Sequence, residues 1–158
     1  MSRITRPLLA TRGATPLSAK GPGMNDLRIL IVEDVKDSAD TMAILLAHWG
    51  YQATIVQDGE RALEVASALL PDVVFLDIGL PGMSGYEVAR RLRSLPTLTD
   101  VLLVAITGHG RQVDIQRCKE AGIDFHFLKP VEPDVLKRIL ERDEATLGVR
   151  EVLVSGSA

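Results

Sequence analysis

The sequence contains a single cysteine, Cys118, and few aromatic residues, which make up 4% of its 158 residues. One cysteine excludes an intramolecular disulfide framework and a cysteine-based metal site. The longest apolar runs are about six or seven residues, far below the roughly 20 that a membrane-spanning helix requires. No segment combines a basic start, an apolar middle and a small-residue cleavage site, as a signal peptide does. These absences predict a globular protein of a reducing, cytoplasmic compartment.

Acidic residues are absent from the first 23 positions, where Arg and Lys supply a charge of +4. Four of the 18 basic residues lie there, so the rest of the chain has 14 basic and 21 acidic residues and a net charge of −7. An acidic body argues against a nucleic-acid footprint, which requires clustered Lys and Arg. We interpret residues 1–25, rich in small and polar residues, as a disordered N-terminal extension. A basic, acid-free segment also suits a transit peptide, and a start of translation at Met24 is a further alternative.

Four apolar runs each end in a polar residue suited to phosphate or metal chemistry. Each run predicts a short strand buried on both faces, which is typical of a parallel sheet covered by helices. The runs are residues 27–32 before Glu33 and Asp34, 73–76 before Asp77, 101–106 before Thr107, and 125–128 before Lys129 and Pro130.

Segments with a helical spacing of apolar residues separate these runs, and residues 52–56 add a further short strand. In one predicted helix, three basic residues face outward, namely Arg90, Arg91 and Arg93. Five strand–helix units in residues 26–142 fit an α/β fold, a doubly wound five-stranded parallel sheet with five helices. Right-handed crossovers and one reversal favour the flavodoxin-like strand order 2-1-3-4-5. Residues 143–158 are expected to form a short C-terminal tail without an output domain.

This strand order brings together the ends of the first and third strands, at the point where open α/β sheets bind ligands. Glu33, Asp34 and Asp77 would then form a cluster of carboxylates, and a cation relieves their mutual repulsion. Oxygen ligands of this kind suit Mg²⁺. Taken by itself, the Glu33–Asp34 pair is also typical of a solvated loop or a helix cap.

The acidic residues, the loop 80–85, Thr107 and Lys129-Pro130 carry a family resemblance. In type, order and spacing they resemble the receiver domain of two-component response regulators, over roughly residues 26–142. The sequence is similar to chemotaxis-type single-domain regulators and to receivers attached to hybrid histidine kinases.

The resemblance implies a Mg²⁺ site made by Asp34, Asp77 and the backbone carbonyl of Gly79, with Glu33 acting directly or through water. The family often has Asp at the position of Glu33, so the part that this longer side chain takes in coordination stays open. Asp77 is the implied phosphoacceptor, because a carboxylate is a competent nucleophile toward phosphorus.

The resemblance also implies roles for residues beside the acceptor. Lys129, whose peptide bond to Pro130 is cis in the family, meets a phosphoryl oxygen. The hydroxyl of Thr107 moves to hydrogen-bond the phosphoryl group, and His126 turns inward as it does so. Taken by themselves, Thr107 suits a strand terminator and His126 a packing residue. His109 is expected at the rim of the site, where it influences hydrolysis of the phosphoaspartate.

The implied function is that of a single-domain response regulator in a phosphorelay. A histidine kinase or a histidine phosphotransfer protein donates the phosphoryl group of its phosphohistidine to Asp77. The phosphoprotein signals by protein–protein contacts through its fourth helix, fifth strand and fifth helix, as a monomer or a phosphorylation-dependent dimer, with no nucleic acid or membrane as partner. It is expected not to be an enzyme in the metabolic sense, because it catalyses only its own phosphorylation and dephosphorylation.

Two alternatives stay open. An aspartate-nucleophile phosphohydrolase shares the chemistry but usually has a second Asp two residues after the nucleophile, where this chain has Gly79. A phosphorylation-independent interaction module would keep the fold and lack the chemistry. The complete set of Asp34, Asp77, Thr107 and Lys129 argues against that module.

Overall fold

The computed structural model describes residues 26–108 and 114–141, along which strands and helices alternate. The strands are β1 (Ile29–Val32), β2 (Ala53–Val56), β3 (Val73–Asp77), β4 (Leu102–Thr107) and β5 (Phe125–Leu128). The helices are α1 (Lys36–His48), α2 (Gly59–Leu69), α3 (Gly85–Ser94), α4 (Ile115–Glu120) and α5 (Pro133–Glu141), with a short 3₁₀ turn, η1 (Pro96–Leu98), before β4. All the predicted strands are present; β5 has the predicted bounds, and those of the other strands differ from the prediction by one or two residues. The expected N-terminal extension, the C-terminal tail and His109 lie outside the described residues.

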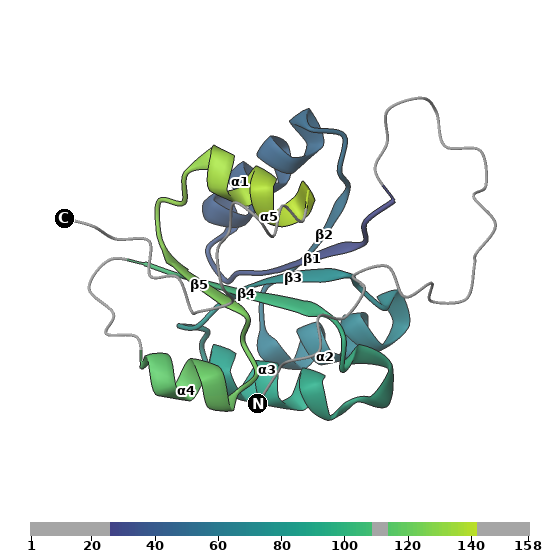
Figure 1. Cartoon of the computed structure of the whole chain (residues 1–158), viewed down its shortest axis with the longest axis vertical. Helices are drawn as coiled ribbons and strands as arrows, with labels where there is room; N and C mark the ends of the chain where they lie inside the picture. The colour runs from purple at the N-terminus through teal and green to yellow at the C-terminus, as the bar shows by residue number, and fades with distance from the viewer. Residues whose placement is uncertain (1–25, 109–113, 142–158) are drawn as a thin grey trace.

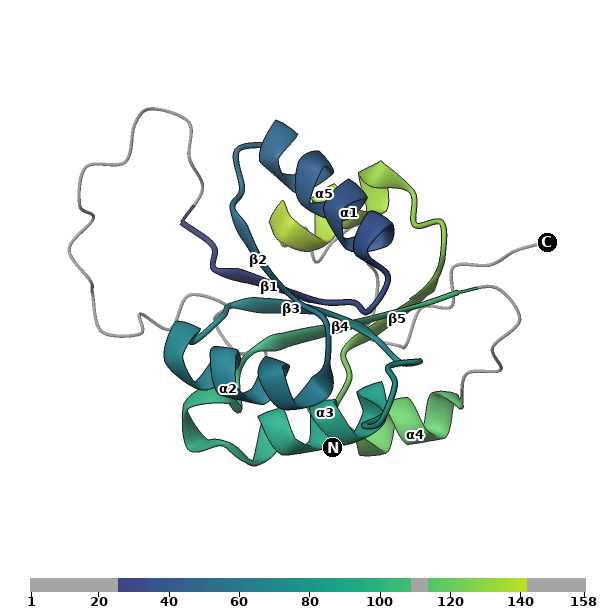
Figure 2. The same cartoon turned by 180° about the vertical axis from the view of Figure 1, so that it is seen from behind.

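The strands form one parallel sheet in the order β2-β1-β3-β4-β5, which confirms the predicted order. Helices α1 and α5 cover one face of the sheet, and α2, α3 and α4 cover the other (Figures 1 and 2). The strand order reverses between β1 and β3, where Val32 is in register with Leu76. Glu33 and Asp77 follow these two partners, so both residues lie at the same edge of the sheet.

Alternate residues of each strand belong to two hydrophobic cores, one on each face of the sheet. In β1, Leu30 and Val32 pack on the side of α2 and α3, whereas Ile29 and Ile31 pack on the side of α1 and α5. Full burial of such an aliphatic side chain contributes about 1.5–3 kcal/mol. This two-sided burial makes the sheet a rigid base for the polar residues at its carboxyl edge.

Side-chain caps begin three of the helices. The carboxylate of Asp58 accepts the N–H of Arg61 at the start of α2, and that of Asp114 accepts the N–H of Arg117 at the start of α4. At the start of α3, the Ser84 hydroxyl accepts a backbone N–H three residues later. Each cap satisfies an N–H that the first helical turn leaves without a partner. No helix in the described part of the chain has the length and hydropathy of a membrane span.

The prediction that Arg93 faces outward with Arg90 and Arg91 is wrong. The Arg93 side chain is only 21% exposed, and its guanidinium donates to the carbonyl oxygen of Gly122 and to the carboxylate of Asp124. Arg93 lies near the end of α3, and its long side chain reaches across the edge of the sheet at which β4 and β5 begin. Carbonyl groups at the turns there offer it better partners than solvent does.

Candidate functional site

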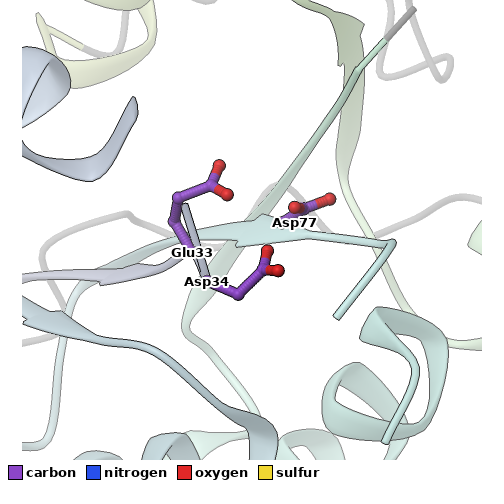
Figure 3. A group of neighbouring side chains, drawn as sticks. All are labelled: Glu33, Asp34 and Asp77. Atoms are coloured by element: carbon purple, nitrogen blue, oxygen red, sulfur yellow. The ribbon is translucent and has the colours of Figure 1, made fainter. Parts of the chain in front are cut away.

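Three carboxylates gather where β1 and β3 end. Oxygen atoms of Glu33, Asp34 and Asp77 all lie within 4.8 Å of one another. Figure 3 shows the three side chains projecting from the ends of these neighbouring strands, with the carboxylates of Glu33 and Asp34 directed to different sides. The predicted acidic cluster is therefore present, and the parallel register of β1 and β3 produces it.

Glu33 is buried and tightly held. Its Oε1 atom accepts the N–H of Val35 at 3.1 Å, and its Oε2 atom accepts the hydroxyl of Ser38 at 3.3 Å. The same Oε2 atom forms an ion pair with the ammonium group of Lys129. Asp34, in contrast, is exposed to solvent. Glu33 thus anchors Lys129 at the site, and sequence reasoning missed Ser38, whose one signal is its place in the first turn of the following helix.

Asp77 is a buried carboxylate at the last position of β3, only 9% exposed. Burial raises its pKa to about 6, and the nearby charge of Glu33 adds to this rise. The N–H of Gly79, which donates to Oδ1 at 2.9 Å, and the charge of Lys129 oppose the rise in this pKa. Ionisation of Asp77 therefore costs free energy unless a further cation binds beside it.

The loop between β3 and α3 folds back tightly onto the acceptor strand. The N–H of Gly85 donates to the carbonyl oxygen of Ile78 at 2.9 Å. A Cβ atom on Gly85 would lie 2.5 Å from the carbonyl oxygen of Asp77 and 2.6 Å from Cα of Ile78. Only glycine permits this approach, which keeps Gly79 beside the acceptor. Gly85 belongs to the loop that the sequence singles out, but its role in positioning Gly79 is visible only in three dimensions.

Lys129 lies at the carboxyl end of β5, and its peptide bond to Pro130 is cis, as the resemblance implies. The backbone N–H of Lys129 donates to the carbonyl oxygen of Thr107 at 2.7 Å. Its ammonium group is close enough to lower the pKa of Asp77. β3, β4 and β5 together therefore place a nucleophilic carboxylate, a hydroxyl and an ammonium group along one edge of the sheet.

Thr107 and His126 are both buried and share a hydrogen bond between Oγ1 and Nε2, which are 3.2 Å apart. Burial lowers the pKa of His126 and favours its neutral ring. Within the described residues, its Nδ1 atom is buried without a hydrogen-bond partner. The inward position, expected of His126 after phosphorylation, is thus already present here, and the switch role stays a prediction.

The donor set of this site fits a hard divalent cation. Carboxylate oxygens are ligands that Mg²⁺ prefers, and Mg²⁺ commonly uses one or two carboxylates and keeps several waters. The exposed Asp34 and the buried Asp77 meet this description, and the cluster has an excess of negative charge that a cation would offset. Glu33, already held by three donors, is the least free of the three carboxylates.

Comparison with known proteins identifies relatives of this chain by sequence. The family model of the response regulator receiver domain matches residues 29–141. The chain is 36% identical over 132 residues to the sensor histidine kinase RcsC of Salmonella typhimurium. This alignment covers 83% of this chain and 14% of RcsC. It is 37% identical over 120 residues to the DNA-binding response regulator MtrA of Mycobacterium leprae, covering 76% of this chain and 51% of MtrA. The chain therefore spans a small part of the kinase and about half of the regulator.

Solved structures agree. The receiver domain of the sensor histidine kinase PA1611 from Pseudomonas aeruginosa, which has a magnesium ion coordinated in its active-site cleft, superposes with a TM-score of 0.67 at 32% identity, over 73% of this chain and 95% of that one. A CheY-like receiver domain from Methylobacillus flagellatus gives a TM-score of 0.66 at 35% identity, over 75% of this chain and 98% of the other. With the strand order and the acidic edge described above, these matches show that the chain belongs to the response regulator receiver domain family of two-component signal transduction.

Proposed function

We propose that this receiver domain is a phosphoacceptor switch in which Asp77 takes a phosphoryl group from a phosphohistidine. The observation that carries the proposal is the position of Asp77, a buried carboxylate with Asp34 on one side and the ion-paired Lys129 nearby. A sensor histidine kinase or a histidine phosphotransfer protein would be the donor. The similarity to RcsC and MtrA, whose names describe a histidine kinase and a response regulator, supports this choice.

The transfer exchanges one bond for another. A carboxylate oxygen of Asp77 forms a P–O bond as the P–N bond of the phosphohistidine breaks, and the electron pair of that bond stays on the imidazole nitrogen. Lys129 then leaves Glu33 and places its positive charge against a phosphoryl oxygen, while the hydroxyl of Thr107 donates to another oxygen. Phosphoryl transfer depends mainly on such positioning and charge neutralisation, so few residues suffice.

Mg²⁺ is part of the proposal. Asp34, Asp77 and the carbonyl of Gly79 would hold the ion, with Glu33 contributing directly or through water. When bound, Mg²⁺ neutralises charge on the phosphoryl group and on the carboxylates. The raised pKa of Asp77 supports this requirement, because the cluster favours a proton on that carboxylate when no further positive charge is present.

The proposed output is a contact with another protein, through the surface of α4, β5 and α5. The domain would catalyse only its own phosphorylation and dephosphorylation, and would turn over no further substrate. The location of such a switch would be cytoplasmic, and the free thiol of the buried Cys118 is compatible with a reducing compartment.

The proposal is tested by incubating the full chain with acetyl phosphate and Mg²⁺ and separating the products on a phosphate-affinity gel. We expect a retarded, base-labile band that requires Mg²⁺ and disappears in Asp77→Ala. The matched control is Asp134→Asn, which removes an exposed carboxylate in the first turn of α5 and should leave the band unchanged.

The donor is tested by repeating the incubation with a purified phosphorylated histidine kinase. A phosphorylated band that forms with the kinase but not with acetyl phosphate would show that the switch depends on a protein donor. The absence of a band with both donors, in a folded chain that binds Mg²⁺, would contradict the proposed function. It would favour instead an interaction module that works without phosphorylation.

A further inference from the structure

Tyr86, the second residue of α3, directly follows the glycine that packs on the acceptor strand. Gly85 has room for no side chain against the backbone of Asp77 and Ile78. The backbone at Tyr86 is therefore held at a fixed distance from the phosphoacceptor. A shift of the loop that contains Gly79 would be passed to Tyr86 with little loss, because close-packed backbone does not compress.

The side chain of Tyr86 holds the first turn of α4. Its ring is buried, and its hydroxyl oxygen accepts the N–H of Asp114, the cap residue of α4, at 3.1 Å. The guanidinium carbon of Arg117 lies 4.3 Å from the centre of the same ring, in a cation–π contact. Both partners belong to the start of α4, which lies beside α3 on one face of the sheet in both views (Figures 1 and 2).

The other end of α4 is held differently. Gly122, just past the end of the helix, has φ of +79°, and its carbonyl oxygen accepts two N–H groups of Arg93 at 3.0 and 2.8 Å. Arg93 also donates to the carbonyl oxygen of Thr99 and to the carboxylate of Asp124. Charge-assisted hydrogen bonds of this kind are stronger than neutral ones. The end of α4 far from Asp77 is thus held by several charge-assisted hydrogen bonds. Among the described residues, the near end is held by the Tyr86 contacts, by its own cap and by the burial of Cys118.

We propose that Tyr86 is a positioning residue that couples the phosphoacceptor to α4. Phosphorylation of Asp77 shifts the start of α3. Tyr86 transmits this shift to the first turn of α4, and α4 tilts about its end at Gly122. This route is separate from the Thr107–His126 pair, which lies on β4 and β5. It rests on the proposed phosphorylation of Asp77.

The test uses the full chain with Tyr86→Phe, which keeps the buried ring and removes only the hydroxyl. Amide hydrogen exchange of α4 is measured by mass spectrometry before and after phosphorylation with acetyl phosphate and Mg²⁺. In the unphosphorylated variant, exchange at the start of α4 should be about two- to tenfold faster, which is the range for loss of one net hydrogen bond. The change in α4 exchange upon phosphorylation should fall to less than half of that in the unaltered chain.

Arg117→Gln provides a second variant that removes the cation–π contact and should reduce the response of α4 in the same direction. Its matched control is Lys119→Gln, which removes the same charge from the exposed side of α4 and should leave the response unchanged. All three variants should be phosphorylated as fast as the unaltered chain, because none of these residues contacts the acceptor.

The two readouts separate the two proposals. A normal phosphorylated band with an unchanged response of α4 in Tyr86→Phe would overturn the coupling alone. A gel on which the unaltered chain gives no phosphorylated band would instead contradict the proposed function. Reduced phosphorylation of Tyr86→Phe would also count against the coupling, since Tyr86 would then act on the acceptor itself.

Discussion

The protonation of Asp77 is set by its surroundings more than by its own chemistry. Burial and the neighbouring charge of Glu33 raise its pKa to about 6, against an ordinary value near 3.8. Between these two pH values the folded chain binds more protons at this position than the unfolded chain. The contribution of Asp77 to the free energy of unfolding therefore falls as the pH rises from about 4 to about 6, and stays lower above that range.

Asp77→Asn should remove this cost. Without divalent cations at pH 7.5, we expect the free energy of unfolding to rise by about 2 kcal/mol, because asparagine stays neutral. At pH 4 or below, the variant and the unaltered chain should have nearly equal stability. Urea unfolding at both pH values, with a chelator present, measures the difference.

Addition of Mg²⁺ supplies the control for this prediction. The ion should stabilise the unaltered chain, because a ligand that binds only the folded state raises its stability. It should stabilise Asp77→Asn much less. A variant that is no more stable than the unaltered chain at pH 7.5 would show that Asp77 is ionised at little cost.

At the level of helices and strands, the approach of α3 to β3 determines the shape of the acceptor loop. The whole approach depends on Gly85, whose missing side chain lets the first turn of α3 lie against the backbone of Asp77. Ser84 begins the helix at this point by accepting the N–H of Glu87. The loop is thus held by a cap at one end and a strand at the other.

Gly85→Ala should destabilise the domain by about 2 kcal/mol or more, because its Cβ atom would clash with backbone that has no free space. The affinity for Mg²⁺, measured by calorimetry, should also fall, since Gly79 would move away from Asp77. The matched control is Gly108→Ala, where a Cβ atom meets no described residue within 4 Å, and the free energy of unfolding should change by no more than about 0.5 kcal/mol. Equal effects of the two substitutions would contradict this account of the loop.

Across the molecule, Arg93 connects parts of the chain that are far apart in sequence. Its guanidinium donates to carbonyl groups of Thr99 and Val101 before β4, to Gly122 after α4, and to Asp124 before β5. The carboxylate of Asp124 also accepts the N–H of Leu103 in β4. One side chain therefore joins α3 to the segments at which β4 and β5 begin.

Arg93→Gln should lower the free energy of unfolding by about 3 kcal/mol, because it leaves the half-buried Asp124 carboxylate and several carbonyl groups without their cation. Arg90→Gln, on the same helix, removes an exposed arginine whose ion pair is with Glu87, and should cost less than about 1 kcal/mol. Urea unfolding of both variants makes the comparison. Similar losses in the two variants would show that the Arg93 network adds little to stability.

Much of the candidate site was predictable because it depends on local pattern and one topological rule. Apolar runs and helical spacing indicate the strands and helices, and parallel strands bring their carboxyl ends to one edge. The position of Asp77 beside Asp34 follows from that rule. The error at Arg93 has a physical cause as well, since helical periodicity cannot show how far a long side chain reaches beyond the end of its helix.

The sequence by itself determined the order of the strands and the identity of the acidic, hydroxyl and basic residues at their ends, because these follow from backbone periodicity and chain direction. Only the tertiary structure decided which of these residues pair. Glu33 meets Lys129 and Ser38, His126 lies inside against Thr107, and the pKa of Asp77 is raised. Such pairings depend on distances of a few ångströms between segments remote in sequence. Those distances exist only once the helices have packed against the sheet.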